Sequence, residues 1–165
     1  MSQIEIFLRE LDLEAQITRK MLSRVPEDKY DWRPHPKSMT IRRLATHIAE
    51  LPSWITMALN TSELDFSKNA YKERQIQNNK ELMEFFEKSL DNGRSRLSNA
   101  TEDELSQPWS LRNGEHVFFT TSKGEVIRTF YSQVVHHRAQ MGVFLRLLDI
   151  PIPGSYGPSA DENFA

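Results

Sequence analysis

The chain has 165 residues, of which 38% are hydrophobic and 27% are charged, with a formal net charge of −2. This balance predicts one soluble domain over residues 1–165, and the lack of a basic stretch argues against a nucleic-acid partner. The absence of cysteine excludes disulfides, thiolate metal sites and a cysteine nucleophile. No stretch approaches the ~18 apolar residues of a membrane span, and the N-terminus does not resemble a signal peptide. We therefore expect a cytoplasmic protein with no membrane partner.

Two amphipathic helices are predicted in the first 60 residues. Apolar side chains recur at helical spacing over residues 3–23 and again over residues 41–60. Thr40 is the expected N-cap of the second helix. Pro52 predicts a kink or a local widening in that helix, because proline removes one backbone donor. The polar residues 61–78 are expected to form a long crossover.

A third and a fourth helix are predicted in the second half of the chain. Asn78 or Asn79 should begin a helix that runs to about residue 99, and the capping-box spacing of residues 101–104 suggests one short extra turn. Asn-Gly at residues 113–114, between two β-prone runs, predicts a hairpin. A further capping box at residues 122–125 begins the last helix, which should extend to about residue 148.

These elements favour an all-α fold of the four-helix bundle type. Four helices with a long second connection, and a small β-hairpin before the last helix, fit that class. The tail from residue 151 to residue 158 contains too much proline and glycine for a regular helix or a central strand. Its apolar residues Ile152 and Tyr156 suggest that the tail docks on the bundle.

The last predicted helix carries polar side chains within its apolar stripe. His137 fills a gap in the apolar series, and Gln133 lies one turn earlier on nearly the same face. His47 is on the predicted inward face of the second helix. Metal sites in helical bundles are formed by side chains of facing helices, commonly paired one turn apart. His47, Gln133 and His137 are therefore candidates for a single site.

Two interpretations of these residues remain open. Two imidazoles and one amide oxygen, with water in the open positions, would suit Zn²⁺ or Ni²⁺, and Fe²⁺ or Mn²⁺ less clearly. A metal-bound water would then be acidified and could act as a nucleophile or base near neutral pH. Against this, a histidine on an apolar face is more often hydrogen-bonded in the core, and glutamine is an uncommon metal ligand.

The remaining conspicuous side chains are expected to have structural or surface positions. His136 is about 100° around the helix from His137 and should face solvent or an interface. Arg138 is expected at the surface or in a salt bridge, and Trp54 in the core. His35 and His116 should be exposed. The acidic residues are interpreted as solvated helix faces.

Three passages together resemble the DinB-like (DinB/YfiT) family of metal-dependent four-helix bundle proteins, and they span nearly the whole chain. Residues 32–34 (Trp-Arg-Pro), 39–41 (Met-Thr-Ile) and 44–50 (Leu-Ala-Thr-His-Ile-Ala-Glu) resemble the first histidine motif of the family. Residues 133–140 are similar to its second motif, H-x-x-H-H-R-G-Q. Residues 152–161 resemble the closing segment of many members.

The resemblance implies an up-down-down-up bundle, often dimeric, in which three histidines hold one divalent metal, with Zn or Ni expected. By position, these ligands would be His47, Gln133 and His137. This chain departs from the family pattern at Gln133, where a histidine is usual, and glutamine binds nickel or zinc less tightly than imidazole. Ala139 replaces the usual glycine, which favours helix continuity.

The resemblance also implies two functional expectations. Related families look like thiol S-transferases and isomerases that use bacillithiol, mycothiol or glutathione, in which a metal lowers the pKa of the cofactor thiol. The first expectation is a metal-dependent transferase, hydrolase or related enzyme acting on a small molecule with a low-molecular-weight thiol. The second is a non-catalytic, stress-related binding module with a weakened or metal-free site. The sequence alone leaves the enzyme question open.

Overall fold

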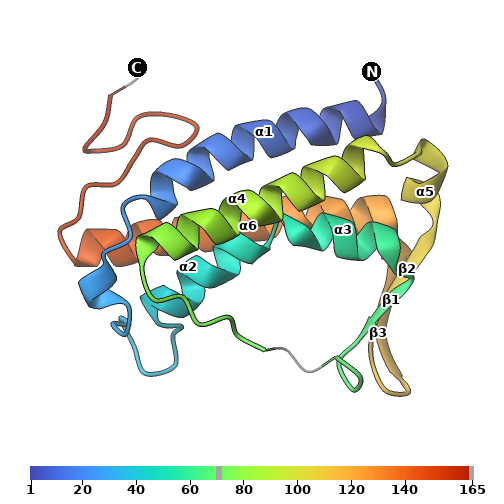
Figure 1. The fold of residues 1–165 in the computed structure, drawn as a ribbon, viewed down its shortest axis with the longest axis horizontal. Helices are drawn as coiled ribbons and strands as arrows, with labels where there is room; N and C mark the ends of the chain where they lie inside the picture. The colour runs from blue at the N-terminus through green and yellow to red at the C-terminus, as the bar shows by residue number, and fades with distance from the viewer. Residues whose placement is uncertain (70–71, 164–165) are drawn as a thin grey trace.

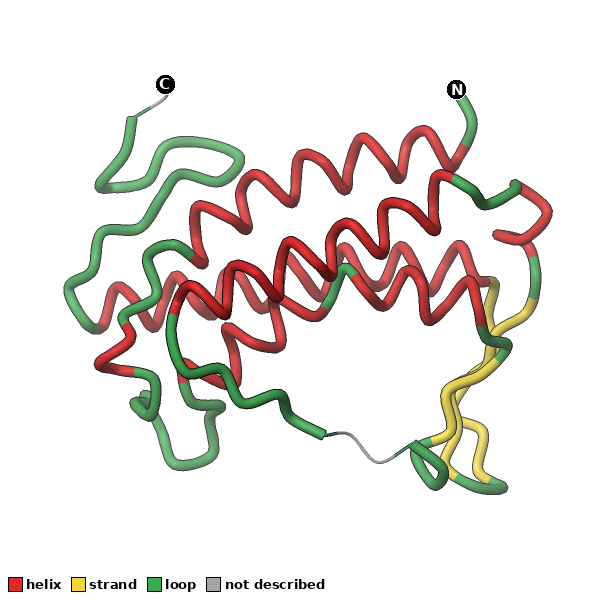
Figure 2. The backbone as a smooth tube through the Cα atoms, viewed as in Figure 1, coloured by secondary structure: helices red, strands yellow, loops and turns green. Residues whose placement is uncertain are grey.

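In the computed structural model the protein is mainly helical, with one small three-stranded sheet at one end (Figures 1 and 2). The structure describes residues 1–69 and 72–163. In chain order the elements are α1 (Gln3–Leu22), the 3₁₀ helix η1 (Glu27–Lys29), α2 (Ile41–Glu50), α3 (Ser53–Asn60), β1 (Glu63–Asp65), α4 (Asn79–Ser98), α5 (Glu102–Ser106), β2 (Pro108–Asn113), β3 (His116–Ser122) and α6 (Lys123–Leu147).

Most helices begin at a side-chain cap, and the sequence predicts each of these caps except the one at Ser2. At the start of α1, α2, α4, α5 and α6, a side-chain oxygen accepts a hydrogen bond from the backbone N–H three residues later. Such caps satisfy backbone donors that have no partner within the helix. The cap residues are Ser2, Thr40, Asn78, Thr101 and Ser122.

The predicted second helix is divided into α2 and α3 by a turn at Leu51 and Pro52. Pro52 has no N–H to continue the hydrogen-bond ladder, and the N–H of Trp54 instead donates to the carbonyl of Leu51. The kink predicted at Pro52 is therefore confirmed. Helix α4 passes this turn at Gly93, where an added Cβ would lie only 2.2 Å from the carbonyl oxygen of Pro52.

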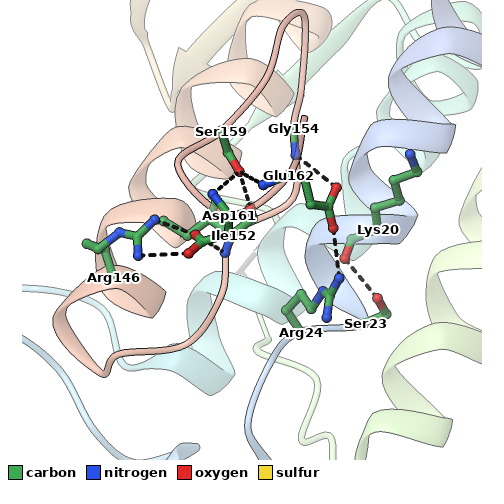
Figure 3. Close-up of polar contacts among 9 residues, drawn as sticks. All are labelled: Lys20, Ser23, Arg24, Arg146, Ile152, Gly154, Ser159, Asp161 and Glu162. Atoms are coloured by element: carbon green, nitrogen blue, oxygen red, sulfur yellow. Dashed lines mark hydrogen bonds and ion pairs between the residues drawn. The ribbon is translucent and has the colours of Figure 1, made fainter. Parts of the chain in front are cut away.

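The helices enclose one apolar core. Both α4 and α6 pack against α1, α2 and α3, and buried apolar residues from all five helices form a single continuous cluster. After α6, the tail lies beside the C-terminal part of α1 (Figure 1). Asp161 accepts hydrogen bonds from Arg146 of α6, and Glu162 forms an ion pair with Arg24, just after α1 (Figure 3). These contacts fix the tail to α6 and to the end of α1. Ile152 packs against the core, as predicted.

The sheet has the order β1-β2-β3, so it adds one strand to the hairpin that was predicted within a mainly helical fold. The predicted hairpin is confirmed as β2 and β3, with Gly114 at φ 60° in its two-residue loop. Strand β1 was not predicted, because residues 63–65 lie in the segment interpreted as a crossover. It pairs in parallel with β2, so it depends on a partner more than 40 residues away. Residues 70–71 of that crossover lie outside the described residues.

The helices can also be compared with the thickness of a bilayer. Over residues 1–69 and 72–163, no helix has both the length and the apolar character required to cross a membrane.

Replacing Gly93 with alanine should destabilise the protein strongly. The new methyl group would overlap the Pro52 carbonyl, and because that oxygen is backbone, the turn itself must move. We expect Gly93→Ala to lower the free energy of unfolding by about 1–3 kcal/mol or more, measured by urea denaturation.

Gly142→Ala in α6 is the matched control. A Cβ at Gly142 would lie in ordinary contact, 3.7 Å from Met21 and 3.8 Å from Ile152. Alanine is about 1 kcal/mol more favourable than glycine within a helix, so this variant should be neutral or slightly stabilised. Equal effects of the two substitutions would contradict the close approach at Gly93.

Candidate functional site

Two histidine side chains meet where α2 and α6 pack together. The ring centroids of His47 on α2 and His137 on α6 lie 4.6 Å apart, with the ring planes at 80°. Both side chains are half-buried. The structure therefore brings together two of the three predicted site residues, which are 90 positions apart in the sequence.

Each imidazole is held by an acceptor three residues later on its own helix. The Nδ1 atom of His47 is 2.7 Å from Oε1 of Glu50, and the Nδ1 atom of His137 is 2.8 Å from Oε1 of Gln140. A carboxylate or amide oxygen only accepts hydrogen bonds, so each Nδ1 carries the proton. In the neutral ring Nε2 then carries the lone pair. Neither Nε2 atom hydrogen-bonds to any residue that the structure describes.

The surroundings of His137 favour its neutral form. Burial is the main cause that lowers its pKa below the usual value of 6.5, and the nearby His47 and His136 rings act in the same direction. The hydrogen bond to Gln140 raises the pKa, but it does not offset these effects. A neutral imidazole is the form that can donate a lone pair to a metal ion.

Gln133, the third predicted site residue, lines a cavity next to the histidine pair. It precedes His137 by one helical turn, and side chains at this spacing are neighbours on a helix surface. The cavity has a volume of about 650 Å³, and Glu50 and Trp54 contribute to its wall together with Gln133. The side-chain amide of Gln133 makes no hydrogen bond to another described residue.

Two contributors to the site were missed or misassigned in the sequence interpretation. Trp54 was expected in the core, but it is half-buried and lies in the cavity wall. Its ring meets the His47 ring edge-on, with the two ring centroids 5.7 Å apart. Glu50 was not singled out, although it follows His47 by the same three residues that separate Gln140 from His137. That repeated spacing is a signal that the sequence does contain.

Other predicted side chains lie as expected. His35, His116 and His136 are all exposed. The ring of His136 contacts that of His137 at 4.9 Å, so it adjoins the site from the solvent side.

Arg138 forms a buried ion pair directly after His137. Its guanidinium is 2.6 Å from Oε2 of Glu14 on α1, and the two residues are only 2% and 5% exposed. The hydroxyl of Tyr156 accepts from Arg138 and donates to Glu14, which ties the tail into the pair. The salt bridge expected for Arg138 is thus present, but it is in the interior. The interpretation of all acidic residues as solvated is wrong for Glu14.

The chemistry of the donor set fits a divalent metal, with one reservation about its third member. Two imidazoles whose Nδ1 atoms are hydrogen-bonded to acceptors on their own helices are typical of metal ligands with their supporting hydrogen bonds. The third nearby side chain, Gln133, offers a neutral amide oxygen, which is a weaker donor. Among residues 1–69 and 72–163, no three His, Cys, Asp or Glu side chains are grouped so that they could hold a metal ion.

Comparisons with known proteins agree with this fold. The DinB family model matches residues 1–163, and the chain belongs to this family. The uncharacterized protein YrdA of Bacillus subtilis is 23% identical over 163 residues, covering 96% of this chain and 91% of YrdA.

Solved structures show the same fold. A DinB-like protein from Bacillus cereus superposes with a TM-score of 0.72 at 23% identity, covering 94% of this chain and all of that chain. A mycothiol-dependent maleylpyruvate isomerase superposes with a TM-score of 0.61 at 17% identity, covering 84% of this chain and 60% of the isomerase. At these identities the likeness extends to the fold alone.

We predict that His137 titrates below pH 6.5 in metal-free protein. The unfolded chain then binds more protons at this position than the folded chain, so the contribution of His137 to stability falls as the pH drops through 6.5. An NMR titration of the imidazole resonances measures the midpoint directly. A midpoint at or above 6.5 would contradict the burial of this ring.

Proposed function

We propose that this protein binds a divalent metal ion, Zn²⁺ or Ni²⁺, through His47, His137 and Gln133, and uses it in thiol-dependent chemistry on a small molecule. One observation carries the proposal: the two imidazoles lie edge to face with their ring centroids 4.6 Å apart, and each has its Nδ1 hydrogen-bonded to an acceptor on its own helix. A histidine that is only part of a packed core would also need a partner for Nε2, and neither Nε2 atom has one among the residues that the structure describes. Metal-binding histidines commonly combine a hydrogen-bonded nitrogen with a second nitrogen left for the ion.

Each side chain at the site has a separate role in this proposal. Glu50 and Gln140 hold the Nδ1 protons and thereby orient the rings. Gln133 supplies its amide oxygen from the cavity wall. When bound, the metal would lower the pKa of a thiol or a water molecule beside it. The cavity next to Gln133 would hold the small molecule and exclude most of the solvent around it.

The comparisons support the thiol part of the proposal. One structural neighbour is named as a mycothiol-dependent isomerase. A low-molecular-weight thiol must be reduced to react, so we place the protein in the cytoplasm.

In the same proposal, the fold is an up-down-down-up four-helix bundle in which α2 and α3 together form the second helix.

A second candidate function is a non-catalytic, stress-related binding module without a metal. Gln133 favours it, because an amide is a weak ligand where the family usually has a histidine. The absence of a third His, Cys, Asp or Glu beside the pair, within the part of the chain that is described, favours it as well. In this case the histidines would contribute to stability only.

Titration of the tag-free protein with Zn²⁺ in a calorimeter should separate the two candidates. We expect wild-type binding at one site and at least a tenfold loss of affinity in His47→Ala and His137→Ala. Gln133→His should tighten binding at least tenfold, because imidazole is a better ligand than an amide for zinc.

His136→Ala is the matched control for these variants. It removes an adjacent but exposed imidazole of α6, so its zinc affinity should equal that of the wild type. If the wild type binds none of Zn²⁺, Ni²⁺ and Mn²⁺, the second candidate is favoured. A Gln133→His affinity equal to that of the wild type would remove Gln133 from the proposed ligand set.

We also propose that the protein forms a homodimer. Support comes from the solvent-facing side of α6, where Val143 and Leu147 are 58% and 59% exposed and lie one turn apart. Equilibrium sedimentation should give twice the monomer mass of 19.3 kDa. Val143→Glu should shift the protein to the monomer, and a wild-type monomer at high concentration would contradict the proposal.

A further inference from the structure

The sheet presents a continuous apolar face to the cavity. Leu64, Leu111 and Phe119 are in register across β1, β2 and β3, and all three line the cavity. Trp109 and Thr121 form the next cross-strand pair on the same face, because side chains two residues apart on a strand point in the same direction. One wall of the cavity is therefore a mainly apolar face of the sheet.

Two helical stripes form the opposite wall. On α3 the lining residues are Trp54 and Met57, and on α6 they include Val126, Phe130 and Gln133. These positions are separated by three or four residues, so on each helix they lie on one face. The cavity is thus bounded by two helix faces and one sheet face.

The cavity changes character along its length. Glu50 and Gln133 are at one end of the cavity, beside the histidine pair. Glu50 is hydrogen-bonded to His47, and Gln133 is one helical turn from His137. Away from that end the lining is mainly apolar on both helices, with Thr129 as the polar residue on α6. From Gln133 to Val126 is seven residues, or about 10 Å along the helix axis.

Two aromatic side chains of the cavity wall are only partly covered by other parts of the described chain. Phe66 and Phe119 both line the cavity, and they are 48% and 47% exposed. Covering such surface with an apolar ligand is favourable because it removes the surface from water. The charged residues of the wall are Glu50 and Lys72, whose formal charges cancel.

We propose that the cavity binds an elongated, neutral small molecule with an aromatic or aliphatic body about 10 Å long, the length of the apolar passage along α6. Its polar or reactive end lies at Glu50 and Gln133, and its apolar body lies between the sheet and the stripes of α3 and α6. The position of the reactive end rests on the proposed function, whereas the apolar body rests on the lining residues alone.

The test uses N-phenyl-1-naphthylamine, a neutral aromatic dye that fluoresces in apolar surroundings. We expect saturable 1:1 binding to the full-length wild-type protein, with and without Zn²⁺. Val126→Trp fills the apolar passage and should weaken dye binding at least tenfold. Thr129→Trp, at a more exposed position of the same wall, should also weaken it and serves if Val126→Trp does not fold.

Ile6→Trp is the control, because Ile6 is an exposed apolar residue of α1 that lies outside this cavity. Its dye affinity should equal that of the wild type. Absence of saturable binding to the wild type, or unchanged binding in both cavity variants, overturns the inference.

Zinc titrations of the same samples keep the two proposals separate. Retained zinc binding without dye binding leaves the proposed metal site standing and removes the apolar ligand. Dye binding that is lost in the cavity variants, in a protein that binds no metal, supports the apolar ligand and counts against the proposed metal site.

Discussion

The arrangement of the site depends on the close approach of α4 to the turn between α2 and α3. Glu50 and Trp54 lie on either side of this turn, at Leu51 and Pro52. Glu50 contacts His47 within α2, and the change of helix direction brings Trp54 of α3 into the wall of the same cavity. Gly93 permits α4 to pack directly on the Pro52 carbonyl. A larger side chain would overlap the Pro52 carbonyl and displace the turn, and with it both residues. The packing of α4 at Gly93 therefore restricts the positions of Glu50 and Trp54 in the site.

Helix α6 is fixed on its other side by the buried ion pair of Arg138 with Glu14. A buried charge that lost its partner would cost about 3–5 kcal/mol, so this pair strongly disfavours any rotation or sliding of α6 against α1. His137 is the adjacent residue, and its position is restricted as a consequence. The hydroxyl of Tyr156 hydrogen-bonds to both charged groups, which makes the tail part of the same restraint.

Local patterns predicted much of this structure, and contacts between distant segments account for what they missed. The helix starts could be predicted because a cap involves residues only three apart, and His47 and His137 could be placed inward from periodicity. The Glu14–Arg138 pair spans 124 positions, and β1 forms only by pairing with β2. The partial exposure of Trp54 could not be predicted either, because it depends on the cavity that α3 forms with the sheet.

Gln133 belongs both to the proposed metal site and to the cavity proposed to bind a small molecule. As a half-buried amide in the cavity wall, it has both an acceptor and donors available, whereas a histidine at this position would offer one lone pair and would bind a metal more tightly. In the proposed metal site an amide would therefore bind the ion more weakly than an imidazole, while it offers a hydrogen-bonding group at the polar end of a mainly apolar passage. We therefore expect glutamine at position 133 to favour the orientation of a small molecule over tight binding of a metal ion in the proposed site.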